Sequence, residues 1–308
     1  MEKGLVIKST GSRYKVLFGN GEIADCVIRG KLREKNSRTT NPVAVGDNVQ
    51  FEFERSKATG VISSILARRN YILRKASNLS KESQIIAANI DLLFLMVTIV
   101  LPETSFEFID RLLITAEAYG IPAVILINKI DIYNESEKKR MKYLDSLYNK
   151  VGYECIMLSV KDDKGVAFVK ERMKDKVSLV AGNSGVGKTT LINKLNPLLN
   201  LKTESVSDYH KQGKHITTFP EMHPLPFGGY VIDSPGLRGF GVIDMDRNEI
   251  FHFFPEIFRT SKDCRFYNCL HLNEPGCAVR EAVEKKMIDP QRYRSYVNIL
   301  EDNNRKYR

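Results

Sequence analysis

The segment from Gly182 to Thr190 constrains this chain more than any other part of the sequence. Apolar residues from Val177 to Ala181 precede it and predict a short buried strand, and Leu191 to Leu195 predict the start of a helix. The spacing G-x-x-x-x-G-K-T between a strand and a helix predicts a phosphate-binding loop, because backbone N–H groups there converge on phosphate oxygens. We expect the whole segment to line a nucleotide: Gly182, Asn183, Ser184, Gly185, Val186, Gly187, Lys188, Thr189 and Thr190.

Two side chains of this loop have specific predicted roles. Lys188 can reach the β- and γ-phosphates, and the Thr189 hydroxyl can hold Mg²⁺.

Apolar runs at 90–97, 123–127 and 155–158 predict further buried strands, and the segments 106–119 and 135–151 have the spacing of amphipathic helices. Strands that alternate with helices predict a doubly wound α/β domain.

The ends of two of these predicted strands carry a second motif. Asn128-Lys129-Ile130-Asp131 follows the strand at 123–127, and Ser159-Val160 follows the strand at 155–158. In open α/β sheets, ligands bind at the carboxyl ends of the strands. The carboxylate of Asp131 can accept hydrogen bonds from guanine N1 and N2, a pair of donors that adenine lacks. Asn128 can contact the base edge or neighbouring loops, and the Lys129 stem can cover the base plane. A backbone N–H near Ser159 or Val160 can reach guanine O6, so the motif predicts guanine specificity.

Residues on the C-terminal side of the phosphate loop predict a nucleotide switch. Thr217 or Thr218 can meet Mg²⁺ and the γ-phosphate, and the choice between them stays open. Asp233, at the end of a predicted strand, can bind Mg²⁺ through water, and the Gly236 N–H can sense the γ-phosphate. Leu237 stands where many Ras-like enzymes have a water-positioning Gln. His215 is our candidate substitute, and a solvated loop histidine is the alternative.

The first 72 residues predict an all-β unit, and short strand-like runs there surround a basic loop. A small barrel of the OB type fits this pattern, and an SH3-like barrel fits nearly as well. Such barrels often bind RNA, although a structural barrel with a solvated loop is equally compatible. Arg68-Arg69-Asn70 and Arg74-Lys75 predict a linker after it.

A cysteine-rich cluster marks the C-terminal part, which otherwise is predicted to be helical and basic. Cys264, Cys269, His271 and Cys277 lie within fourteen residues. Three thiolates and one imidazole predict a closed structural Zn²⁺ site, one per chain. Basic residues around Tyr293 and Tyr296 predict either RNA contact or a solvated helix.

Composition limits the function classes. The formal net charge of +10 suggests a nucleic-acid partner, and 43% hydrophobic residues suffice for globular cores. No apolar run reaches the length of a membrane span, and the N-terminus lacks the pattern of a signal peptide. We therefore expect a cytoplasmic protein without a membrane partner, and we expect it to be a monomer.

The order of the motifs is similar to that of a known family. N-K-x-D precedes the phosphate loop and D-x-x-G follows it, so the chain looks like a circularly permuted GTPase. Together with the basic barrel and the pattern Cys-x4-Cys-x-His-x5-Cys, this order resembles the bacterial small-ribosomal-subunit-dependent GTPase A family. The resemblance implies a GTPase that binds the small ribosomal subunit, including its 16S rRNA, late in maturation, with hydrolysis of GTP to GDP stimulated by the subunit.

The resulting prediction is a multidomain protein. It has an OB-type β-barrel at 1–72, a circularly permuted GTPase α/β domain at 73–240, and a helical zinc-binding domain at 241–308. Mg²⁺ is expected with GTP.

A nucleotide-gated RNA-binding or RNA chaperone module, whose hydrolysis is incidental, is the alternative from another class. An ATPase is contradicted by Asp131. Since Gly236 leads directly into the C-terminal domain, nucleotide state is also expected to move that domain.

Overall fold

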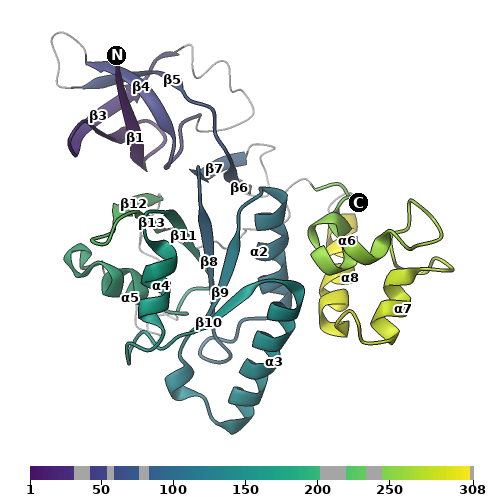
Figure 1. The fold of residues 1–308 in the computed structure, drawn as a ribbon. Coiled ribbons are helices and arrows are strands. Elements are labelled where there is room, and N and C mark those ends of the chain that lie inside the picture. The colour runs from purple at the N-terminus through teal and green to yellow at the C-terminus, as the bar shows by residue number, and fades with distance from the viewer. Residues whose placement is uncertain (31–41, 54–58, 76–82, 202–219, 234–244, 306–308) are drawn as a thin grey trace.

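The computed structural model of this chain describes residues 1–30, 42–53, 59–75, 83–201, 220–233 and 245–305. A β-barrel, a central α/β domain and a group of helices follow one another along the chain. The barrel and the C-terminal helices lie against different sides of the central domain (Figure 1). Among the described residues, no helix is both long enough and apolar enough to cross a lipid bilayer.

Five strands form the N-terminal barrel. They are β1 (Glu2–Ser9), β2 (Tyr14–Phe18), β3 (Glu22–Ile28), β4 (Asn48–Phe53) and β5 (Gly60–Ile65). The strand order is β1-β2-β3-β5-β4, and β4 pairs back with β1, which closes the barrel. This closed, OB-like arrangement confirms the OB-type prediction over the SH3-like alternative. Its core is built from its own alternating residues, among them Val6, Val16 and Phe51.

A small two-stranded sheet connects the barrel to the central domain. Strand β6 (Tyr71–Lys75) pairs antiparallel with β7 (Ser83–Ala88). The segment predicted as a linker thus connects the two units, but its second half is a paired strand rather than an irregular chain, and Ile72, Ile85 and Ile86 bury apolar surface there. Strand β6 also crosses the domain boundary that we expected at residue 72.

The central sheet has six strands in the described part of the chain, and the expected phosphate loop follows the carboxyl end of one of its inner strands. Its strands are β8 (Leu92–Val97), β9 (Ala123–Ile127), β10 (Glu154–Met157), β11 (Val177–Ala181), β12 (Glu221–Pro224) and β13 (Tyr230–Asp233). Their order is β10-β9-β8-β11-β13-β12, and all neighbours are parallel except β12 and β13. The chain runs outward from β8 to β10 and then returns to β11 beside β8. The carboxyl ends of β8 and β11 therefore flank the switch point of the sheet, where α/β folds bind ligands.

Four helices cover the two faces of this sheet, as a doubly wound fold requires. They are α2 (Phe106–Ala118), α3 (Glu135–Val151), α4 (Val166–Met173) and α5 (Lys188–Leu195). Helices α2 and α3 pack on the face that contains Leu93 and Leu95. Helices α4 and α5 pack on the opposite face, which contains Phe94 and Met96. Because both faces are covered, the inner strands β8 and β9 are apolar throughout rather than alternating.

The C-terminal part is helical, as predicted. It contains the 3₁₀ turn η4 (Ile250–Phe253) and the helices α6 (Pro255–Ser261), α7 (Ala278–Glu284) and α8 (Pro290–Arg305). Two more 3₁₀ turns, η1 (Ile130–Ile132) and η2 (Pro197–Leu199), belong to the central domain. The core of the C-terminal helices includes Ile114 of α2, so the two parts share buried apolar surface.

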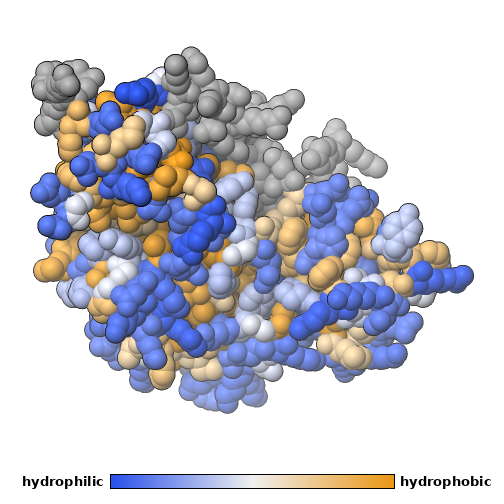
Figure 2. Space-filling view, turned by 45° about the horizontal axis from the view of Figure 1, so that its top comes forward, coloured by the Kyte–Doolittle hydropathy of each residue, from blue (hydrophilic) through white to orange (hydrophobic). Residues whose placement is uncertain are grey.

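The barrel joins the central domain through both backbone and side chains. Strand β1 pairs with β12, which makes the barrel and the central sheet one continuous sheet of 11 strands. A hollow of about 410 Å³ lies at this junction, lined among others by Leu5, Leu17, Phe18 and Tyr230. On the face shown in Figure 2, hydrophobic residues gather mostly over the barrel and the junction, and hydrophilic residues cover most of the remainder.

Candidate nucleotide-binding and metal sites

The phosphate loop forms the turn from β11 to α5. Its glycines are required by conformation and by space. Gly182 and Gly187 have φ of +147° and +106°, a region that L side chains rarely adopt. A Cβ at Gly182 would lie 2.3 Å from the Met96 carbonyl oxygen, and one at Gly187 would lie 2.5 Å from Asn128 Nδ2. Only glycine therefore lets the loop lie this close to β8 and β9.

Lys188 begins helix α5 and curls back over the loop. Its Nζ donates to the carbonyl oxygens of Gly182 at 3.0 Å and Asn183 at 2.8 Å. The ammonium is thus held above the concave side of the turn, where a bound phosphate would replace these neutral acceptors with charged ones. Thr189 is half-buried and Thr190 is exposed in the first turn of the same helix.

Asn128 holds the guanine motif against the phosphate loop. Its side chain is only 3% exposed. The Nδ2 group donates to the Val186 carbonyl at 2.8 Å, and Oδ1 accepts from the Val160 N–H at 3.2 Å. One amide therefore links the phosphate loop, the end of β9 and the loop after β10. The three segments that the sequence assigned to one nucleotide lie together at the carboxyl ends of their strands.

Asp131 and Lys129 occupy the outer part of the same site. Asp131 is exposed in η1, and the Ser159 hydroxyl donates to its Oδ1 at 2.7 Å. Lys129 has φ of +65°, and its Nζ donates to the Leu101 carbonyl. Partial burial lowers the pKa of Lys129, and the charge of Asp131 opposes that shift. Ile130 is half-buried between them.

The backbone N–H groups of Ser159 and Val160 are already paired within the protein. The Ser159 N–H donates to the Lys164 carbonyl at 3.1 Å, and the Val160 N–H donates to Asn128. Either group would have to exchange its partner to reach guanine O6, so this part of the expected base contact has a competitor. Sequence alone gave no signal of it.

Asp233 lies at the end of β13, opposite Val180 of β11, the strand that leads into the phosphate loop. Burial raises the pKa of its carboxyl, while the charges of Lys188 and His223 lower it. A half-buried carboxylate with a lysine of the phosphate loop nearby is suited to hold a hydrated divalent cation. His215, Thr217, Thr218 and Gly236 lie outside the described residues, so their expected roles stay predictions.

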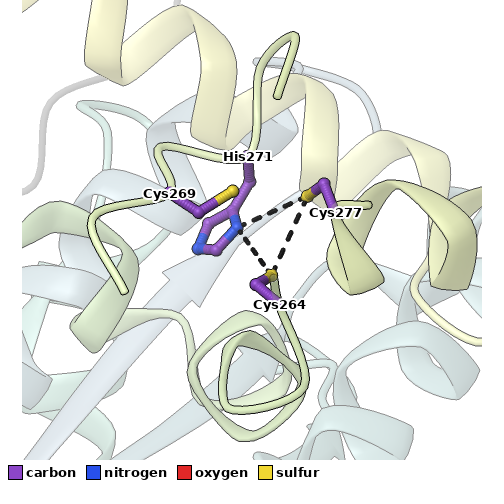
Figure 3. A group of neighbouring side chains, drawn as sticks. All are labelled: Cys264, Cys269, His271 and Cys277. Atoms are coloured by element: carbon purple, nitrogen blue, oxygen red, sulfur yellow. Dashed lines mark hydrogen bonds between the residues drawn. The ribbon is translucent and has the colours of Figure 1, made fainter. Parts of the chain in front are cut away.

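The cysteine cluster closes into one site between η4, α7 and α8. Cys264, Cys269, His271 and Cys277 place their ligand atoms within 4.8 Å of one another (Figure 3). His271 Nδ1 is 3.5 Å from Cys264 Sγ and 3.6 Å from Cys277 Sγ, and the two sulfurs are 4.0 Å apart. Tetrahedral Zn²⁺ with ordinary bond lengths would separate S from N by about 3.6 Å and two S atoms by about 3.8 Å. The donor set and its spacing fit a four-coordinate metal ion.

Three further residues stabilise this site, and their supporting role was not predicted from the sequence. Glu274 accepts the N–H groups of Leu270, Leu272 and Asn273 at 2.8–3.0 Å. The hydroxyls of Tyr293 and Tyr296 donate, each at 2.7 Å, to the carbonyls of His271 and Leu270.

Three residues of the basic segment are therefore not free to contact RNA as we had predicted, whereas contact by its exposed residues stays a prediction. Tyr296 and Arg292 are fully buried, and Tyr293 is half-buried. Their spacing in the sequence shows a helix but does not tell which face is buried.

Family models match two stretches of the chain. The model of the RsgA GTPase matches residues 65–243, and that of the RsgA N-terminal domain matches residues 3–62. The chain belongs to the RsgA GTPase family. It is accordingly a GTP-hydrolysing enzyme, which agrees with the phosphate loop and guanine motif described above.

Relatives with curated names resemble the chain over nearly its full length. The small ribosomal subunit biogenesis GTPase RsgA of Bacteroides fragilis is 52% identical over 97% of this chain and 96% of its own. The protein of the same name from Christiangramia forsetii is 50% identical over 99% of this chain and 98% of its own.

Solved structures of the same architecture agree with this RsgA assignment. YjeQ from Thermotoga maritima has a TM-score of 0.79 at 32% identity and covers 98% of both chains. YloQ, which is described as a circularly permuted GTPase, has a TM-score of 0.73 at 29% identity, covering 98% of this chain and 94% of its own. The predicted circular permutation is thereby confirmed.

Proposed function

We propose that this RsgA-family enzyme is a GTP-driven assembly factor of the small ribosomal subunit. The observation that carries the nucleotide part is Asn128, which links the phosphate loop at Val186 to the loop at Val160. The ribosomal part is supported by the names of its relatives, which are about half identical to the chain over nearly its full length. Binding to 16S rRNA is supported by the OB-like barrel and by a net charge of +10.

Different residues of the site bind the phosphates, the base and the metal ion of GTP. Backbone N–H groups of the loop and the N-terminus of α5 bind the phosphates, and Lys188 neutralises charge that develops between the β- and γ-phosphates. Asp131 accepts hydrogen bonds from the guanine edge, and Ser159 holds its carboxylate in place. Thr189 and Asp233 would hold Mg²⁺, which supplies electrostatic stabilisation of the transferred phosphoryl group when bound.

The cysteine cluster is proposed to hold one structural Zn²⁺. Cys264, Cys269, His271 and Cys277 supply all four ligands of a tetrahedron, so no position is left for substrate. We keep the division into units at 1–72, 73–240 and 241–308 as a proposal, supported by the core that the barrel strands enclose among themselves. We also propose that the protein is a monomer and that it acts in the bacterial cytoplasm, where small ribosomal subunits are assembled.

The guanine assignment is tested by Asp131→Asn. An amide presents a donor where guanine N1 also presents one, so GTP should bind at least tenfold more weakly. Xanthosine triphosphate, whose base has an oxygen at this edge, should gain affinity. Titration of both nucleotides against wild type and variant measures the exchange. An unchanged preference for GTP in the variant would overturn the pocket assignment.

The assembly role is tested by turnover with and without small subunits. An assembly GTPase should hydrolyse GTP much faster when small subunits are added, whereas large subunits serve as the matched control. Equal turnover in all three conditions would favour an RNA-binding module whose hydrolysis is incidental.

A further inference from the structure

One interface of the barrel lies directly beside the proposed magnesium site. Strand β1 of the barrel pairs with β12 of the central sheet, and Lys8 is the residue opposite Glu221. Their side chains form an ion pair, with Lys8 Nζ 2.8 Å from Glu221 Oε2. Both side chains are about one-third exposed, at 37% and 31%. Lys8 of the barrel therefore places one positive charge beside β12 of the central sheet.

The register of the next strand pair brings this charge close to Asp233. Glu221 lies directly opposite Asp233 in the antiparallel pair of β12 and β13. Residues directly opposite on an antiparallel pair point to the same face, with Cβ atoms about 5 Å apart, and like charges in such positions repel. His223, two residues further along β12, lies on that face as well.

We propose that Lys8 is a positioning residue of the magnesium site, acting from the barrel through Glu221. While Lys8 pairs with Glu221, Asp233 faces a neutral pair, and Mg²⁺ meets the charge of a single carboxylate. When Lys8 no longer pairs with Glu221, the Glu221 carboxylate is a second uncompensated negative charge next to Asp233. The site then attracts a divalent cation more strongly. Barrel attachment and Mg²⁺ binding are thus thermodynamically linked, and each changes the other by the same factor.

This linkage gives the barrel a means to influence the nucleotide site without touching it. Lys8 is exposed enough for an anionic partner, such as an RNA phosphate, to compete with Glu221 for its ammonium. A partner that draws Lys8 away would raise the Mg²⁺ affinity at the site. The inference rests on the proposed role of Asp233 in holding Mg²⁺.

The test uses the full chain with a fluorescent non-hydrolysable GTP analogue and Mg²⁺ titrated at constant ionic strength. The midpoint Mg²⁺ concentration for analogue binding is the readout, because a purely structural role of the pair would not move it in opposite directions. Lys8→Gln should lower the midpoint about two- to fivefold, and Glu221→Gln should raise it by a similar factor. The double variant should return close to wild type, and Lys8→Arg should behave as wild type.

Lys285→Gln is the matched control. Lys285, at the end of α7, pairs with Glu281 at 3.5 Å, so this variant also removes the lysine of an ion pair but leaves β1 and β12 unchanged. Midpoints of Lys8→Gln or Glu221→Gln within the spread of this control would overturn the inference. Asp233→Asn separates the two levels of the argument. An unchanged midpoint in Asp233→Asn would overturn the magnesium assignment itself, whereas a changed one with inert Lys8 variants would overturn only the linkage.

Discussion

The barrel and the C-terminal helices are attached to the GTPase domain in different ways. The barrel encloses its own core. It meets the central domain through backbone hydrogen bonds, through polar side chains and through Val45, which is buried in the core of the central sheet. The Ala88 N–H donates to the Val45 carbonyl at 2.8 Å, and Asn89 Nδ2 donates to the Gly46 carbonyl at 2.8 Å. The C-terminal helices share their core with Ile114 of α2 and are held by buried charges.

Those buried charges centre on Arg292 of α8. Its guanidinium lies between Asp110 of α2 at 2.5 Å and Glu256 of α6 at 2.6 Å, and both Arg292 and Asp110 are fully buried. Tyr148 of α3 also donates to Asp110, at 2.7 Å. Burial raises the pKa of Asp110, and the charge of Arg292 opposes this shift. Attachment through backbone tolerates most side-chain changes, whereas attachment through a buried ion network depends on single residues.

Removal of a proposed zinc ligand should give the largest effect. Cys269→Ala leaves three ligands and should abolish stoichiometric Zn²⁺, since structural zinc contributes on the order of 10 kcal/mol in small zinc domains. We expect the C-terminal helices to become sensitive to proteolysis, while GTP binding persists. Elemental analysis and limited proteolysis measure both. Cys155→Ala is the control, because Cys155 lies in β10 outside the cluster. Wild-type protein that is stable without metal would contradict the assignment.

Breaking the buried ion network should have the next largest effect. Arg292→Met leaves Asp110 buried without its charged partner, which should cost about 3–5 kcal/mol in the free energy of unfolding. Urea denaturation and hydrogen exchange of α8 measure the loss. Arg294→Met is the control on the same helix, because Arg294 is exposed. The double variant Asp110→Asn/Arg292→Met should recover part of the stability, and equal effects of Arg292→Met and Arg294→Met would show that the network does not hold the interface.

Arg292 also shows which features of the structure could not be predicted from the sequence. Apolar runs at Leu92–Val97 and Ala123–Ile127 and the glycine spacing of the phosphate loop determine local structure, and all three were predicted correctly. The basic segment that contains Arg292 was expected to contact RNA or solvent, because a charge in a sequence does not reveal a partner such as Asp110, 182 residues away. Burial of an ion pair depends on long-range packing, which periodicity does not contain.

Short elements escaped prediction for a related reason. Strand β12 has only four residues and ends in Pro224, so it shows no alternating pattern. It exists because β1 and β13 pair with its two edges. For the same reason the proximity of Lys8 and Glu221 to Asp233 could not be predicted. The switch roles of Thr217, Thr218 and His215, and the expected movement of the C-terminal domain, stay predictions.

At the attachment of the barrel, a change that disturbs the backbone at Gly46 should be costly. Gly46 has φ of +90°, and a Cβ there would lie 2.1 Å from the Ala88 carbonyl oxygen. Gly46→Ala should therefore destabilise the protein by about 2–3 kcal/mol. Gly11→Ala is the matched control, because Gly11 has φ of +85° and nothing within 4 Å, so that only the backbone strain of about 1 kcal/mol remains. Similar thermal shifts for both variants would mean that the contact at Ala88 contributes little.

The smallest effect on stability is expected from the ion pair at the same interface. Lys8→Ala removes a partly exposed pair at 2.8 Å, and such pairs contribute less than about 1 kcal/mol because water and salt screen them. The backbone hydrogen bonds of Val45 and Gly46 stay intact in this variant, so the barrel should remain attached. A double-mutant cycle with Glu221→Ala, measured by urea denaturation at low and high salt, gives the coupling energy. It should fall further at high salt. A coupling above about 2 kcal/mol, comparable with the loss at Arg292, would mean that side-chain charge holds the barrel too, and the contrast between the two attachments would then disappear.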